Sequence, residues 1–467
     1  MSIDRRSFLK GIGAGAMFMA AGDLRGQGTS AAPATSSRAA SRDGRPNIVL
    51  ILGDDHTYTD AGCYGNKDVQ TPNIDKLCSQ GMRFTNAHTA SAMCVPTRSM
   101  LYTGLYPVKT GAYPNHSDAY ANIKTIAQYM KALGYRVALA GKIHVSPKEV
   151  FAFDYIKANE PQVEAVMTGE GPFCLIYASI HPHSPWRRGL YDPAKLTVPP
   201  YLADTPETRQ ALADYYYEVT GLDTEVGMCL DLLDKHKLAD NTLTIYTSEQ
   251  GAQFPHGKWT CYDVGLKVQF IARWPGHIKP GSTSDAMISY VDFVPTAVEL
   301  AGGKPIEGLN GKSMLPVLTG KADKLHDAVF GVHTTKGILY GSECYPIRSI
   351  RTDTHKYIWN LKPDAAFKNI VTAKPPAYWK SWIAKAKTDP KAARLVEEYQ
   401  HRPEEELYDL ANDPFELNNV AAAPANAELK AALRKRLDAF MKEQGDKGIE
   451  TEMDAKSRQN RQVEGAE

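Results

Sequence analysis

The alternation of hydrophobic and polar segments predicts a mainly parallel β-sheet with helices between its strands. Short runs rich in Val, Ile, Leu and Ala recur along the chain, and segments with helical spacing separate them. Charged or imidazole side chains closely follow four of these runs, at 47–52, 135–140, 173–180 and 243–247. Ligands of open α/β sheets bind outside the carboxyl ends of the strands, so the four endings predict a single site.

The polar residues at these endings are the candidate site residues. In chain order they are Asp54 and Asp55, Lys142 and His144, His181 and His183, and Glu249 and Gln250. Pro182 forces an extended backbone between the two histidines, so we expect those side chains to point in different directions. Oxygen ligands alone suit Ca²⁺ better than zinc. Each position also has an ordinary alternative: a helix cap for the acidic pair, a surface lysine, a loop histidine, or a turn at the fourth ending.

A cysteine stands at the start of a predicted helix between the first two runs. Pro96 suits the first turn of a helix and Gly104 suits its end, which places Cys94 at the N-terminus. Arg98 follows about one turn later and can reach back. Free backbone N–H groups and the helix dipole favour an anion at such a position.

These motifs resemble the formylglycine-dependent sulfatases over about residues 46–421. Cys94-x-Pro96-x-Arg98 matches the family's maturation signature, in which the cysteine is oxidised to formylglycine (3-oxoalanine). Three further motifs occur in the same order along the chain as in the family: the acidic pair, the Lys-x-His motif and the stretch 406–414. The resemblance implies an alkaline-phosphatase-like α/β sandwich. Such a fold has a large mixed, mostly parallel sheet and a smaller C-terminal subdomain with a small antiparallel sheet.

The resemblance also implies a role for each site residue. A formylglycine-generating enzyme would convert Cys94, and the hydrated aldehyde would bind Ca²⁺ and attack sulfur. The implied metal ligands are Asp54, Asp55, position 94, Glu249 and Gln250. Five side chains have implied catalytic roles. Arg98 and Lys142 would hold the hydrate and the sulfate, and His144 would accept a proton. His183 and Lys258 would contact the sulfate and protonate the leaving group. The family usually has Asp followed by Asn or His where this chain has Glu-Gln, so we expect the ligand geometry to adjust.

Several stretches look closest to the N-sulfoglucosamine sulfohydrolase (heparan sulfamidase) branch, including 141–145, 151–154 and 355–360. That likeness makes Arg348 a candidate substrate contact, with a salt-bridged strand residue as the alternative, and His181 a second one. The implied substrate is a sulfated amino sugar of a glycan. An O-sulfatase on another polysaccharide, a phosphonate or phosphodiester hydrolase of this fold, and a glycan-binding pseudo-sulfatase with unmodified Cys94 remain alternatives.

The ends of the chain differ from its body. Paired arginines before the apolar run 11–22 predict a twin-arginine export signal over 1–30, with the translocase as a partner and a periplasmic or extracellular location. A disordered linker is expected over 31–44, a catalytic domain over 45–335 and a C-terminal subdomain over 336–467. In this subdomain we expect strands near 347–351 and 357–361, a helix over 427–442, and a frayed tail of about the last twenty residues.

Composition narrows the class of partner. The 467-residue chain is 43% hydrophobic and 23% charged, with a net charge of +1. Because this balance has no basic excess, nucleic acid and anionic membranes are excluded as main partners, and we expect no stable membrane insertion. The seven cysteines are an odd number, so at least one cannot pair within the chain.

Overall fold

A computed structural model describes residues 44–460, and the export signal and nearly all of the linker lie outside these residues. The large sheet has the strand order β4-β3-β5-β1-β6-β7-β2-β8, and β9 pairs with β2. All of its neighbouring strands are parallel except β6–β7 and β2–β7. The strands are β1 (Asn47–Gly53), β2 (Met82–His88), β3 (Arg136–Gly141), β4 (Asp154–Ile156), β5 (Phe173–Ala178), β6 (Thr242–Ser248), β7 (Lys267–Arg273), β8 (Ser282–Ser284) and β9 (Ile288–Ser289).

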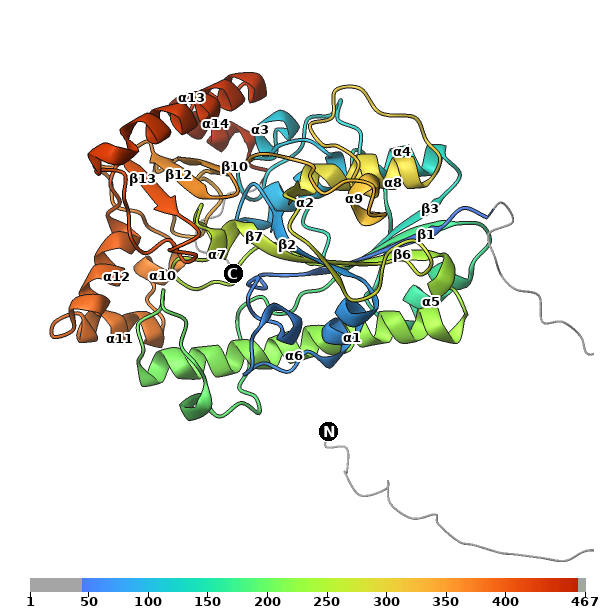
Figure 1. The fold of residues 1–467 in the computed structure, drawn as a ribbon, viewed down its shortest axis with the longest axis horizontal. Coiled ribbons are helices and arrows are strands. Elements are labelled where there is room, and N and C mark those ends of the chain that lie inside the picture. Colours follow the sequence, from blue (N-terminus) through green and yellow to red (C-terminus); the bar gives the residue numbers. More distant parts are fainter. Residues whose placement is uncertain (1–43, 461–467) are drawn as a thin grey trace, which may run out of the picture. The chain divides into compact units, whose positions relative to one another are not determined.

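Helices cover both faces of this sheet, so its central strands are buried on both sides. One layer contains α1 (Pro72–Gln80), α5 (Glu160–Thr168) and the long α6 (Pro206–Lys235), and the other contains α2 (Cys94–Thr103), α4 (Ile126–Ala132) and α8 (Phe293–Leu300). Figure 1 shows α1 and α6 on one side of the strands and α4 and α8 on the other. Alternate residues of β1 enter the two layers: Val49 packs toward α6, and Leu50 packs toward α8.

A second, antiparallel sheet of four strands follows in the order β10-β11-β12-β13. Its strands are β10 (Val329–His333), β11 (Ile347–Arg351), β12 (His355–Asn360) and β13 (Glu405–Asp409). Polar contacts join it to the segment before β7, since Tyr262 donates to Glu406 at 2.7 Å and Lys356 contacts Asp263 at 2.8 Å. The predicted fold class, with one large mixed sheet and one small antiparallel sheet, is confirmed.

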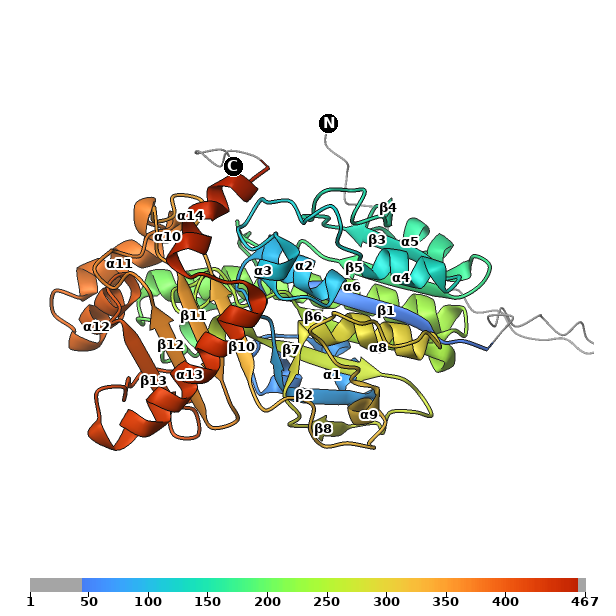
Figure 2. The same cartoon turned by 90° about the horizontal axis from the view of Figure 1, so that it is seen from above.

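The short helices α10 (Ile370–Ala373), α11 (Ala377–Lys385) and α12 (Pro390–Gln400) lie between β12 and β13, and α7 (Asp263–Leu266) leads into β7. The helix α13 (Ala427–Gln444) packs Leu433, Leu437 and Phe440 into the core, and Figure 2 shows this helix beside the small sheet. It covers the helix expected over 427–442.

The prediction of a frayed tail is wrong for ten residues, which form the helix α14 (Ile449–Arg458). Glu452 is fully buried and accepts a hydrogen bond from the backbone N–H of Thr335 at 2.8 Å, and Arg458 donates to the carbonyl of Asp118 at 2.7 Å. Partners more than a hundred residues away hold this charged segment, so its local composition gave no sign of them. Within 44–460, no helix is long and apolar enough to cross a membrane.

Candidate active site

The four strand endings meet at one edge of the large sheet. The strands β3, β5, β1 and β6 are adjacent in that order and run parallel. Their carboxyl ends therefore bring Lys142, Asp54, Asp55, Glu249 and Gln250 together, as the sequence predicts. The helix α2 begins at this edge with Cys94, and Gly104 ends the helix with a positive φ of 73°.

The thiol of Cys94 is the centre of this cluster. Its Sγ lies 3.6 Å from Nζ of Lys142, 3.6 Å from Nε2 of Gln250 and 4.0 Å from Oδ1 of Asp54. The side chain is only 1% exposed. Burial raises the pKa of the thiol, but Lys142 and Lys258 outweigh burial and hold this pKa well below its usual value. The surroundings of position 94 therefore favour negative charge.

Each carboxylate of the cluster is paired with a cation. Lys142 binds Asp54 at 2.5 Å, and Lys258 binds Asp55 at 2.6 Å. Although burial raises the pKa of Asp54, Lys142 outweighs it and holds that pKa well below its usual range. Arg98 completes the set, since its guanidinium binds both oxygens of Glu249.

Arg98 fixes the start of α2 against two strand ends. Besides Glu249, it donates from Nη1 to the carbonyl of Lys142 at 3.1 Å. Burial lowers the pKa of the guanidinium, and the nearby Glu249 carboxylate outweighs that effect and raises it above its usual value. The arginine thus stays charged at every pH at which the protein is folded.

The last two members of the cluster approach Asp55 from different loops. Gln250 donates to Oδ1 of Asp55 at 2.7 Å, and Nε2 of His183 lies 3.6 Å from its Oδ2. His183 is about one-third exposed, so it links the buried carboxylates to the surface. Lys258, the cation that pairs with Asp55, is only 3% exposed.

The donor set fits a hard cation such as Ca²⁺. Single ligand atoms of Asp54, Asp55, Cys94 and Glu249 all lie within 4.8 Å of one another, and all four residues are buried. In addition, Oε1 of Gln250 is buried and has no hydrogen-bond partner. Such an oxygen next to carboxylates is a ligand that Ca²⁺ accepts. If position 94 carried oxygen in place of sulfur, the set would contain oxygen ligands alone.

His144 has a neighbour that sequence reasoning missed. Its Nε2 lies 3.1 Å from Nδ1 of His116, and the two rings are 4.9 Å apart. The preceding residue, Asn115, accepts a hydrogen bond from the backbone N–H of Val95 in the first turn of α2. No spacing or motif joins this loop to the strand endings, so the sequence held no signal for it.

Two predicted substrate contacts have structural partners instead. Arg348 is fully buried, and its guanidinium binds Asp446 and the carbonyl of His333, so none of its surface is open to a ligand. Arg348 is thus a salt-bridged strand residue, which is the alternative that the sequence analysis gave for it. His181 binds Glu218 at 2.7 Å, and this carboxylate also holds Arg187. As expected, His181 and His183 point to different partners.

The site is a buried thiol at the edge of a mixed sheet, surrounded by carboxylates and the charged side chains of Arg98, Lys142 and Lys258. The family model named Sulfatase matches residues 46–166 and 161–303, and the model named N-sulphoglucosamine sulphohydrolase, C-terminal, matches 254–385. The chain belongs to the sulfatase family, which confirms the resemblance given by its motifs.

Individual relatives agree with this assignment. An ulvan-active sulfatase of Formosa agariphila is 38% identical over 443 residues, covering 91% of this chain and 86% of that protein. Human N-sulphoglucosamine sulphohydrolase is 28% identical over 465 residues, covering 84% and 89%.

Solved structures share the fold. A protein in complex with its substrate D-glucosamine-2-N,6-O-disulfate has a TM-score of 0.68 at 21% identity, covering 86% of this chain and 99% of that one. The phosphonate monoester hydrolase of Agrobacterium radiobacter has a TM-score of 0.66 at 18% identity, covering 86% and 96%. At these identities the likeness shows the fold alone.

Proposed function

We propose that this protein hydrolyses a sulfate ester or sulfamate of a glycan, using a formylglycine hydrate made from Cys94. One observation carries the proposal: the Cys94 side chain stands at the N-terminus of α2 among Lys142, Gln250 and Asp54. Oxygens on Cβ would replace Sγ in the hydrate, so the groups now around the sulfur would face them. The hydrate supplies a hydroxyl nucleophile, and bound Ca²⁺ supplies positive charge that favours its ionised form.

The protein's own side chains do the remaining work. Lys142, next to Cys94, and Lys258, next to Asp55, would neutralise the sulfate oxygens as negative charge develops. His183 is the most exposed of the site groups around Asp55 and is placed to protonate the leaving group. His144 would hold the proton released from the second hydroxyl of the hydrate. Asp54, Asp55, Glu249 and Gln250 would hold the cation.

For the substrate, we keep the N-sulfoglucosamine sulfohydrolase branch as the first candidate. The match of 254–385 to the C-terminal model of that enzyme supports it, as does the human relative. The ulvan-active relative, at 38% identity, favours a second candidate, an O-sulfate on another polysaccharide. A sulfated carbohydrate is the common element of both.

Maturation and export complete the proposal. A formylglycine-generating enzyme would act on the Cys94 segment before folding, because the thiol is buried once the protein is folded. Arg5 and Arg6 support export by the twin-arginine translocase to the periplasm or beyond. We also retain residues 45–335 as the catalytic domain and 336–467 as the C-terminal subdomain.

Two measurements test the proposal. Mass spectrometry of the tryptic peptide 84–98 should show the aldehyde in place of the thiol, whereas a pseudo-sulfatase would keep the thiol. The matured protein should then release sulfate from one member of a panel of N-, 2-O-, 3-O- and 6-O-sulfated glucosamine and ulvan oligosaccharides. Release from an O-sulfated sugar alone would overturn the first substrate candidate. Faster turnover of a phosphate ester than of the sulfate ester with the same leaving group would overturn the sulfatase assignment.

A further inference from the structure

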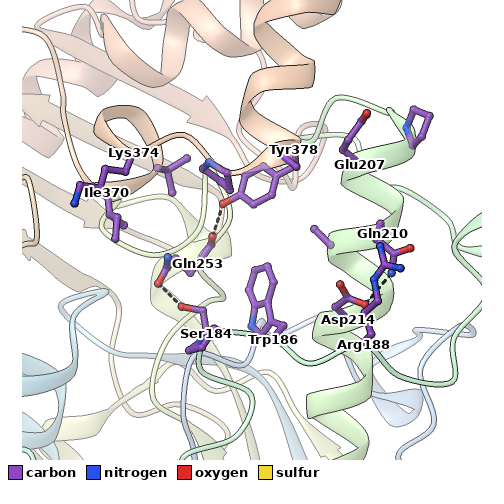
Figure 3. A pocket seen from close by; sticks show the side chains of 16 residues that line it. Ser184, Trp186, Arg188, Glu207, Gln210, Asp214, Gln253, Ile370, Lys374 and Tyr378 are labelled. Carbon is purple, nitrogen blue, oxygen red and sulfur yellow. Dashed lines mark hydrogen bonds between the residues drawn. The ribbon is translucent and has the colours of Figure 1, made fainter. Parts of the chain in front are cut away.

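A cavity of about 650 Å³ lies beside the active site and is used by none of the proposed steps. One of its walls comes from Ser184, Gln253 and the segment 370–378, and the other comes from the start of α6. Figure 3 shows the indole of Trp186 standing between these two walls. The volume of the cavity lies within the range of small-ligand pockets.

Two loops lead from the active site to the wall of the cavity. Ser184 lines the cavity directly after His183, which faces Asp55. Gln253 lines it three residues after Gln250, and the hydroxyl of Ser184 donates to Gln253 at 2.9 Å. Neighbouring Cα atoms are 3.8 Å apart, so the backbone of the cavity wall begins within about 12 Å of these site residues. That is about the reach of two linked sugar rings.

The indole of Trp186 is held in one orientation. Its Nε1 donates to the carbonyl of Pro182 at 2.8 Å, and its ring stacks on Phe254 with centroids 4.7 Å apart. The ring is only half-buried and lines the cavity. A fixed, accessible aromatic ring offers the apolar face of a sugar a large contact at little cost in conformational entropy.

Planar polar groups stand opposite this ring. On α6, Gln210 donates to Asp214 at 2.8 Å, and the exposed Arg188 lies in the same wall, as Figure 3 shows. An amide, a carboxylate and a guanidinium side by side can donate to and accept from neighbouring hydroxyl groups at the same time. An apolar ring facing such a set matches the two kinds of surface that a pyranose presents.

We propose that this cavity binds a second sugar residue of the substrate, next to the sugar that loses its sulfate. In this arrangement Trp186 stacks on the ring, and Arg188, Gln210 and Asp214 bind its hydroxyl groups. The protein would then select oligosaccharides over sulfated monosaccharides. This inference rests on the proposed function, because it assumes a glycan substrate.

The test measures binding rather than turnover. Calorimetric titration of the Cys94→Ala protein with a heparin tetrasaccharide and with an ulvan tetrasaccharide gives the affinity without hydrolysis. Adding Arg188→Ala and Gln210→Ala should weaken the tighter of the two complexes about tenfold, because two hydrogen-bonding side chains are lost. Lys380→Ala is the matched control, since Lys380 is exposed on α11 and does not line the cavity. It should leave the affinity unchanged.

Unchanged affinity in the cavity variant, or no binding of either tetrasaccharide, would overturn the subsite. A thermal melt confirms that each variant folds. Turnover of 4-methylumbelliferyl sulfate by the matured wild-type protein tests the proposed function separately, because this aryl sulfate has no second sugar. No turnover of this aryl sulfate or of any sulfated sugar in the panel, with tetrasaccharide binding intact, would overturn the catalytic proposal and leave the subsite standing. In the active protein, the cavity substitutions should reduce kcat/KM more for the tetrasaccharide than for the aryl sulfate.

Discussion

Glu249 accepts hydrogen bonds from both Nε and Nη2 of Arg98, each at 3.1 Å. Both side chains are completely buried, and they join the end of β6 to the first turns of α2. The extra methylene of glutamate, compared with the family's usual aspartate, gives the carboxylate this reach. Its remaining lone pairs are still able to bind a cation. The departure from the family pattern therefore ties a proposed metal ligand to the helix that carries Cys94.

Glu249→Gln should strongly destabilise the protein. The substitution leaves the Arg98 charge buried beside a neutral amide, and breaking a buried pair in this way costs about 3–5 kcal/mol. The free energy of unfolding, measured with urea in the presence of EDTA, checks this. Glu249→Asp should lose less, because the charge remains. Glu397→Gln, at an exposed position, is the control, and equal stability of Glu249→Gln and this control would contradict the structural role of the pair.

Gln250→Ala should weaken Ca²⁺ binding. The substitution removes the buried, unpartnered Oε1 and the hydrogen bond to Asp55, so we expect the affinity to fall about tenfold to a hundredfold. Calorimetric titration of the EDTA-treated protein with CaCl₂ measures it. Gln70→Ala, at an exposed residue, should bind as the wild type does. Identical affinities of the two variants would remove Gln250 from the ligand set.

The unfolding free energy should carry a pH-dependent contribution from Asp60. Burial raises the pKa of Asp60 to about 6, whereas the unfolded value is about 4. Between these pH values the folded state binds more protons than the unfolded state, so this carboxyl contributes a loss of stability as the pH rises from about 4 to 6.

Asp60→Asn removes this titration while keeping an oxygen that accepts from Thr59 and Asn66. The variant should be more stable than the wild type at pH 7.5 by about 2 kcal/mol, and by much less near pH 4. Urea titrations at the two pH values measure the difference. Asp231→Asn, on the exposed side of α6, should show no such dependence. A destabilising effect of Asp60→Asn at pH 7.5 would show that its hydrogen bonds outweigh desolvation.

Asp446→Asn should destabilise the C-terminal part of the protein. Asp446 binds the buried guanidinium of Arg348, and it also accepts from the backbone N–H of Gly448 at 2.9 Å. We expect a loss of about 3–5 kcal/mol in the free energy of unfolding, because a buried charge is left unpaired. Asp438→Asn is the control, since Asp438 pairs with Arg434 on an exposed face of α13. A change no larger than that of the control would show that the pair of Asp446 and Arg348 does not stabilise the fold.

Much of the fold and of the candidate site follows from the sequence, because the relevant signals are local. Apolar runs such as 47–52 mark strands of a buried sheet, and the polar residues after them mark its ligand-binding edge. Pro96 marks the first turn of the helix that presents Cys94, and Gly104 marks its end. Together with the family motifs, these patterns placed Asp54, Lys142, Glu249 and their neighbours in one cluster.

Only the tertiary structure decided the relationships between distant segments. It paired His116 with His144, buried Arg348 against Asp446, and folded the charged segment 449–458 into a helix held by Thr335 and Asp118. It also brought Trp186 and α6 to one cavity beside the site. None of these contacts has a local pattern, because each depends on which surfaces meet when the layers pack. The sequence thus determined the chemistry at the strand ends, and packing determined which other side chains surround it.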